Sequence, residues 1–218
     1  MPTARESLLD AAQAVLVHRP WSTVRMVEVA ALAGVSRQTL YNEFSSKEGL
    51  GAALVHQRVE VFLRGAAATV ATARREGGDP AVCWATGVVW ILHRAREEPL
   101  VRAAMTGCWS SRLPLPQAPP ERLLERLCER MLAALDAAGA VTCWEAPVVR
   151  RACEAGLRMA LSYVVAPPDE PEAAARVADV VTAMLRHLGD APADTCPPDA
   201  ADPPGAADPP ENGHGRTA

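Results

Sequence analysis

The sequence predicts an all-α protein built from two helical domains, and three observations support this. Hydrophobic residues make up 49% of the 218 residues but aromatic residues only 4%, so alanine, valine and leucine supply most of the burial and favour closely packed helices. Apolar residues recur at helical spacing through most of the chain. Clusters of glycine and proline separate these stretches. We predict a first domain at residues 1–50, a second at 51–189, and a disordered acidic, proline-rich tail at 190–218.

The first helix is expected at residues 3–19. Thr3, followed three residues later by Glu6, is typical of a capping box, and the apolar residues that follow form one stripe along the helix. Pro20 ends the helix, and Trp21 is interpreted as a plug that fills the core between the first two helices.

Residues 25–50 have the pattern of two short helices, a tight turn and the start of a third helix. Gly34 suits the left-handed backbone that a short turn requires. Ser36 can accept a hydrogen bond from a free amide at the start of the second short helix, whose Leu40 and Phe44 point back to the core. This arrangement indicates a helix-turn-helix, so the first domain is expected to be a three-helix unit.

The exposed residues of that second short helix are of the types that bind DNA. Arg37, Gln38 and Thr39, which follow the capping Ser36, can pair with base edges in a major groove. Tyr41 and Asn42 lie where a phenol and an amide can reach phosphate oxygens.

Lys47 is the only lysine in a chain with 22 basic residues. It lies in the first turn of the third helix, which Ser45 or Ser46 can cap. We therefore expect Lys47 to contact a DNA phosphate.

The run from Thr3 to Leu54 resembles the DNA-binding domain of TetR-family transcriptional regulators. Regulators of this family usually have a glycine before the aromatic residue and Thr or Ser as the cap of helix two, where this chain has Pro20 and Arg25. Arginine cannot accept an amide hydrogen bond, but it can bind a phosphate directly, so Arg25 is added to the predicted DNA contacts. The matching residues are Ala11-Ala12, Trp21, Val29-Ala30, Ala33-Gly34-Val35-Ser36, Thr39-Leu40-Tyr41, Phe44 and Lys47-Glu48-Gly49-Leu50.

The rest of the chain to residue 189 reads as a series of helices. The first of these begins at Lys47 and has no breaker before Gly65, and it extends at most to Arg75, where Gly77 and Gly78 end it. A helix of this length can carry movement from one domain to the other. The further helices are expected at residues 80–97, 99–109, 121–138, 144–165 and 172–188.

The resemblance implies that the second domain encloses a pocket for a small effector. Aromatic side chains with one polar atom suit such a ligand, and His93 is a candidate polar anchor inside the pocket. A plain hydrophobic core, with His93 facing solvent or hydrogen-bonded as a structural residue, is the alternative. The candidate ligand-binding residues are Phe62, Trp84, Val88, Trp90, Ile91, His93, Trp109, Leu127 and Tyr163.

The last two helices resemble the pair that forms the dimer interface in TetR regulators. Ala152, Gly156 and Ala160 recur every four residues, so two helix backbones can approach closely along this face. The candidate interface on the last helix consists of Val177, Val181, Met184 and Leu185. The alternative is the core of a single chain.

Charges and cysteines give weaker indications. The net charge is -4, but residues 190–218 hold six acids and one arginine, so the rest of the chain carries +1.

The alternating Glu and Arg residues of 121–138 are interpreted as a solvated helix face. The proline-rich connection before them is interpreted as a candidate ligand gate. The six cysteines show no metal-ligand spacing and are interpreted as reduced cytoplasmic thiols, buried as small hydrophobes rather than acting as redox sensors.

No motif for catalysis, a cofactor, a metal or a membrane span is found in the sequence. The residues and the resemblance together predict a ligand-responsive transcriptional regulator, a repressor, that binds a palindromic double-stranded DNA operator as a homodimer. The effector is expected to be small and apolar or weakly polar. The alternative is a helical small-molecule-binding or hydrolytic protein in which the helix-turn-helix is architectural.

Overall fold

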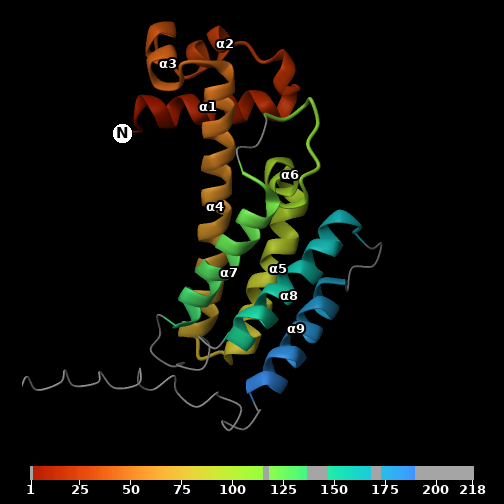
Figure 1. Cartoon of the computed structure of the whole chain (residues 1–218). Helices are drawn as coiled ribbons and strands as arrows, with labels where there is room; N and C mark the ends of the chain where they lie inside the picture. The colour runs from red at the N-terminus through yellow and green to blue at the C-terminus, as the bar shows by residue number, and fades with distance from the viewer. Residues whose placement is uncertain (1, 115–117, 137–146, 168–172, 190–218) are drawn as a thin grey trace, which may run out of the picture.

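The computed structural model describes residues 2–114, 118–136, 147–167 and 173–189. Within these ranges the chain forms nine α-helices, one short 3-10 helix and no strand, which confirms the all-α prediction (Figure 1). The helices are α1 (Ala4–His18), η1 (Trp21–Thr23), α2 (Met26–Leu32), α3 (Arg37–Phe44), α4 (Lys47–Arg75), α5 (Pro80–Glu97), α6 (Pro99–Thr106), α7 (Pro120–Asp136), α8 (Pro147–Val165) and α9 (Ala173–Gly189). The predicted tail, and Cys143 and Cys196, lie outside the described residues.

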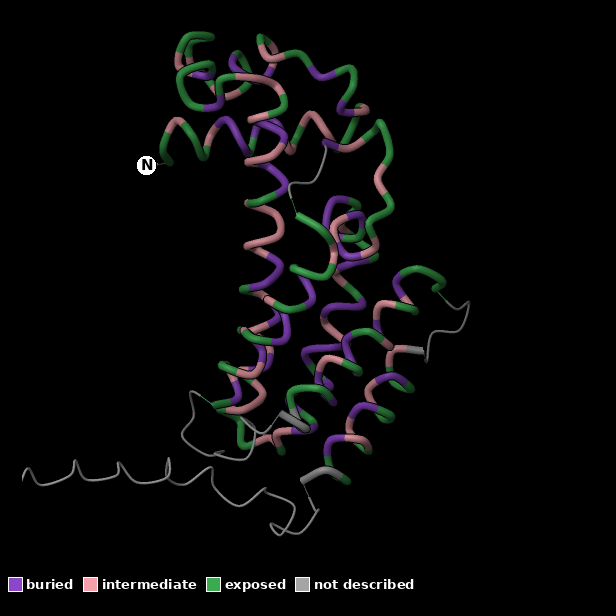
Figure 2. The backbone as a smooth tube through the Cα atoms, viewed as in Figure 1, coloured by how far each residue is buried: buried purple, intermediate pink, exposed green. Residues whose placement is uncertain are grey.

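Two hydrophobic clusters organise the helices. The smaller cluster joins α1, α2, α3 and the start of α4, and we call this part the reader. The larger cluster joins the rest of α4 to α5, α6, α7, α8 and α9, and we call this part the body. Figure 2 marks buried residues along all the helices of the body and the reader. Leu100, the second residue of α6, belongs to the cluster of the reader although its helix lies in the body. A domain boundary at residue 50 therefore stays a prediction, because α4 passes through both parts.

The start of the chain folds as its caps predict. The Thr3 hydroxyl accepts a hydrogen bond from the Glu6 amide at 3.2 Å, and the Glu6 carboxylate accepts one from the Thr3 amide at 2.8 Å, which confirms the capping box. Trp21 is buried, as expected of a core plug. No described helix is long and apolar enough to cross a membrane.

Helix α4 is the longest helix of the described residues and runs from the reader through the body. Ser46 caps it by accepting the Gly49 amide at 3.0 Å, and its 29 residues extend without a break to Arg75. Gly65 lies inside the helix and makes room for the Trp90 ring, which a β-carbon at residue 65 would meet at 2.4 Å. At 1.5 Å per residue, α4 is about 43 Å long.

Helices α8 and α9 lie side by side along one edge of the body, with α5 between α9 and α4 (Figure 1). Gly156, in the middle of the predicted stripe, faces α9 of the same chain, where a β-carbon on it would lie 3.2 Å from Val181, and Ala152 and Ala160 are buried in the body cluster. Val177, Val181 and Leu185 are buried in the body cluster, and Met184 packs against it. Within one chain these residues pack in or against its core, and their assignment to a contact between two chains stays a prediction.

The charged face of α7 also differs from the prediction. Glu60 of α4 accepts hydrogen bonds from two α7 arginines, Arg126 and Arg130, the latter at 2.9 Å. These arginines therefore bind a neighbouring helix rather than water alone. Within α7, Arg122 and Glu125 form a longer ion pair at 3.9 Å.

Candidate nucleic-acid interface

Helix α3 lies at the end of the molecule, where a hydrogen bond caps its start and one apolar face packs against the rest of the reader. Ser36 accepts a hydrogen bond from the Thr39 amide at 3.0 Å, which satisfies a free donor at the helix start. Leu40 and Phe44 are buried in the reader cluster. Gly34 has a φ of 68° and provides the turn between α2 and α3. The opposite face of α3 is thereby left for a partner.

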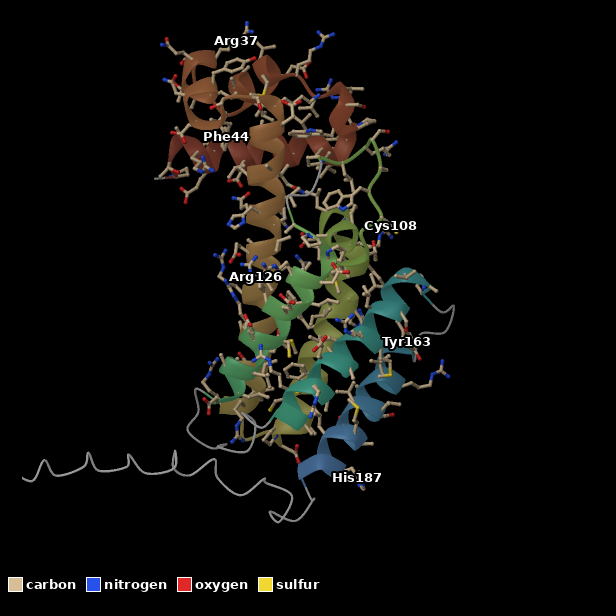
Figure 3. The ribbon with its side chains drawn as sticks, in the orientation of Figure 1. Arg37, Phe44, Cys108, Arg126, Tyr163 and His187 are labelled. Atoms are coloured by element: carbon tan, nitrogen blue, oxygen red, sulfur yellow. The ribbon has the colours of Figure 1, made fainter. Side chains whose placement is uncertain are left out.

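The predicted DNA-reading residues occupy that free face. Arg37, Gln38, Tyr41 and Asn42 are exposed, and Thr39 is half-buried. Figure 3 shows Arg37 at the end of the molecule, directed away from the body. Its guanidinium lies 5.5 Å from the centre of the Tyr41 ring, so the two side chains form one surface that a DNA backbone and base edges could meet.

Arg25 and Lys47, the two other predicted phosphate contacts, have different surroundings. Arg25 is exposed at the N-cap of α2 and makes no side-chain capping bond, as its chemistry predicts. Lys47 donates to the Ser22 carbonyl oxygen at 3.0 Å, and its ammonium lies 5.7 Å from the centre of the Trp21 ring. To bind a phosphate, Lys47 must share or give up these contacts. Nothing in the sequence indicated that Lys47 has partners within the chain.

Two acidic residues of the reader form ion pairs with arginines. Glu28 lies 2.7 Å from Arg19, and Glu43 lies 3.5 Å from Arg5. Arg37 forms no ion pair within the described residues. The reader has no net charge in sequence, but its pairing leaves Arg37 available to a DNA anion.

The reader is attached to the body by more than α4. The Trp21 amide donates to the Arg112 carbonyl oxygen at 2.8 Å, which joins η1 to the segment after α6. Pro114 of that segment packs against Gly51, where a β-carbon would lie 2.7 Å from the proline and 2.9 Å from the Trp21 ring. Leu100 adds the apolar contact described above. Movement of the body can therefore reach the reader along several routes.

Most of the predicted ligand-binding residues fill the core of the body. His93 is exposed, which corrects its assignment to a pocket interior and agrees with the alternative stated above. Trp90 and Tyr163 pack at the margin of the body cluster, and Trp109 packs against the cluster of the reader. Each of the remaining residues has at most 2% of its surface exposed: Phe62, Trp84, Val88, Ile91 and Leu127.

Three cavities instead surround the junction of reader and body. The largest, about 660 Å³, lies between α1, α4, α6 and α7. A second, about 640 Å³, lies beside Trp21, Lys47 and Trp109, and a third, about 360 Å³, lies beside Gln13 and Arg58. Of the predicted ligand residues, Trp109 alone lines one of these three. A junction between two clusters leaves no periodic signal in the sequence, so these cavities could not be predicted.

Two family models cover most of the chain. Residues 8–54 match the model described as bacterial regulatory proteins, tetR family, and residues 79–185 match the model described as the C-terminal domain of the bacterial tetracyclin repressor. The first range contains the whole candidate interface, and the second contains most of the body.

Relatives agree with these matches. The chain is 30% identical over 188 residues to the HTH-type transcriptional regulator AlkX of Mycobacterium tuberculosis, which covers 85% of this chain and 86% of that protein. It superposes on the crystal structure of the TetR family repressor AlkX from Dietzia sp. strain DQ12-45-1b, implicated in biodegradation of n-alkanes, with a TM-score of 0.57, 27% identity, and coverage of 85% and 96%. A TetR-family regulator from Streptomyces coelicolor shares the fold, with a TM-score of 0.52, 20% identity, and coverage of 86% and 98%.

The fold and the exposed helix α3 define a DNA-binding regulator. The chain belongs to the TetR family of bacterial transcriptional regulators.

Proposed function

We propose that this regulator is a cytoplasmic repressor that binds a palindromic operator as a homodimer, with one α3 helix in each of two successive major grooves. The free face of α3 carries the proposal: Arg37, Gln38 and Thr39 supply base-edge contacts, and Tyr41, Asn42 and Arg25 supply phosphate contacts. A single reader covers one half-site, so a second copy is needed to match a two-fold symmetric operator.

The outer face of α8 and α9 is the candidate dimer surface. Val165 and Val180 are 61% and 53% exposed, although both are large apolar side chains. Exposed alanines, Ala155 on α8 and Ala183 on α9, lie on the same two helices and would let a partner helix approach. These residues differ from those that the sequence suggested for the interface.

A small effector is proposed to release the operator by shifting the reader relative to the body. A few kcal/mol of differential affinity between the two positions is sufficient for this. The Dietzia relative is implicated in biodegradation of n-alkanes, and on that basis we propose that the effector has an aliphatic body.

Selection of bound duplexes from a random DNA pool tests the proposal. We expect the intact protein to recover a two-fold symmetric motif, and the Arg37→Ala variant to bind that motif about 10- to 100-fold more weakly, because it loses a contact to a base pair. Arg96→Ala removes an exposed arginine of α5 and serves as the matched control. Failure to enrich any motif at moderate salt would refute the operator-binding proposal.

A further inference from the structure

We propose that the cavity between α1, α4, α6 and α7 binds an amphipathic organic anion, and that this occupant sets the position of the reader. The proposal rests on the proposed effector response and names its site and chemistry. The cavity is about 660 Å³, within the range of roughly 300–1,000 Å³ that small-molecule sites occupy. An inorganic anion would leave most of this volume empty.

The inner wall of the cavity is apolar. Ala52, Ala53, Val55 and Val59 line it from α4, and Leu123 lines it from α7. Val55 and Leu123 are buried members of the reader and body clusters, respectively. Small alanines on α4 create the space, and the branched side chains around them give it a surface suited to an aliphatic or aromatic body.

The lining is cationic as well. Arg5, Arg122 and Arg126 line the cavity together with His56, and none of the described residues that line it is a carboxylate. Arg5 and Arg126 already have partners in Glu43 and Glu60. Arg122 has only a 3.9 Å contact with Glu125, and its side chain is 73% exposed, so it can turn towards an anionic group without losing a strong bond.

The cavity is placed where an occupant acts on the reader directly. Arg5 lies on α1 of the reader, whereas Arg122 and Leu123 lie on α7 of the body. A molecule that contacts both helices fixes their separation. By contrast, Trp84, Val88 and Leu127 are fully buried in the body core, so a ligand there must first displace well-packed side chains.

The experiment titrates the full chain, without DNA, by calorimetry with n-alkanoates of six to sixteen carbons below their micelle concentrations. The 1-alkanols of equal length are the neutral probes. We expect at least one alkanoate to bind saturably, one per chain, and about tenfold more tightly than the matching alkanol, since only the acid can pair with the arginines.

Two variants locate the binding. Arg122→Glu is expected to weaken the alkanoate about tenfold, whereas Arg96→Glu, a charge reversal on an exposed arginine outside the cavity lining, is expected to leave it unchanged. Ala53→Phe fills the cavity and is expected to abolish binding. If Ala53→Phe fails to fold, as judged by circular dichroism, Arg122→Glu decides alone.

The proposal is overturned if no alkanoate binds saturably, if acids and alcohols bind equally, or if Arg122→Glu binds as the intact chain does. Operator selection is done on the ligand-free protein and is scored separately. A chain that selects an operator but binds no alkanoate refutes the anion site alone. One that binds alkanoate but selects no operator refutes the proposed function.

Discussion

Arg58 donates from two nitrogens to one oxygen of Glu98, at 3.1 and 2.5 Å, and so joins the middle of α4 to the point where α5 meets α6. Glu98 also accepts from Arg94. Both Arg58 and Glu98 are largely buried, with side chains 24% and 14% exposed. This contact lies close to Leu100, so it holds α4 at the level of the junction between reader and body.

Replacing the acid of this pair should destabilise the fold. We expect Glu98→Gln to lower the free energy of unfolding by about 2 kcal/mol, because it leaves the largely buried Arg58 without its anion. Urea denaturation measures this. Glu97→Gln, which removes a more exposed partner of Arg94, is the control and should change stability by less than about 0.5 kcal/mol. Equal effects of the two variants would contradict the prediction.

Acid should weaken the contact between α4 and α7. Burial alone would raise the pKa of Glu60, but Arg126 and Arg130 outweigh it and hold that pKa below its ordinary value of 4.5. The stabilisation is therefore present above pH 4.5 and is lost as pH falls through the lower pKa of the folded state. We expect Glu60→Gln to show a smaller loss of stability than the intact chain between neutral pH and about pH 3. Parallel losses in the two proteins would count against it.

Gly51 should not tolerate a β-carbon. Alanine there would lie 2.7 Å from Pro114 and 2.9 Å from the Trp21 ring, which is buried. Alanine favours a helix over glycine by about 1 kcal/mol, but overpacking costs about 1–3 kcal/mol, so we expect Gly51→Ala to be net destabilising. Thermal unfolding followed by tryptophan fluorescence tests this, and Pro114→Gly in the same chain should recover part of the loss. An unchanged or raised melting temperature in the single variant would show the prediction to be wrong.

The described cysteines should differ in reactivity. Burial raises the pKa of Cys128 to about 11, and burial followed by the nearby Cys128 raises the pKa of Cys153. Cys108 is exposed. Because the thiolate is the reactive form, we expect iodoacetamide at pH 8 to label Cys108 at least about tenfold faster than Cys128 or Cys153. Peptide mass spectrometry measures the rates, and comparable labelling of all three would contradict the burial described here.

A charge on the outer face of α9 should weaken the proposed dimer. We expect Val180→Asp to raise the dimer dissociation constant at least about tenfold, because an aspartate would be buried without a partner in the interface. Analytical ultracentrifugation measures the constant. Val82→Asp changes a valine of α5 that is 40% exposed and is the control. The α8–α9 interface is refuted if both variants dimerise as the intact chain does.

Local signals predicted the reader well, because its structure depends on caps, turns and helical spacing. The structure confirms three such local predictions: the capping box of Thr3 and Glu6, the turn at Gly34 and the cap at Ser36. Packing partners were harder to predict. The spacing of Ala152 and Gly156 shows that a helix approaches closely, but a helix of the same chain and a helix of a second chain give the same pattern.

Side-chain type was an equally incomplete guide in the body. The flat ring of Trp84 suits either a pocket or a core, and only the volume left by its neighbours distinguishes them. Arg126 looked like a surface charge because Glu60, its partner, lies 66 residues away in the sequence. Long-range pairing of this kind has no local signature.

Leu100 makes the folding of the reader depend on a residue of the body. Its side chain is 4% exposed and belongs to the cluster of the reader, although residues 51–99 separate it in sequence from the first 50 residues. A reader cut from the chain at residue 54 would expose to solvent the apolar side chains that Leu100 covers in the whole chain. A chimaera that carries this reader on another regulator would therefore also need the start of α6. Such chimaeras can be compared by whether an apolar side chain occupies the place of Leu100.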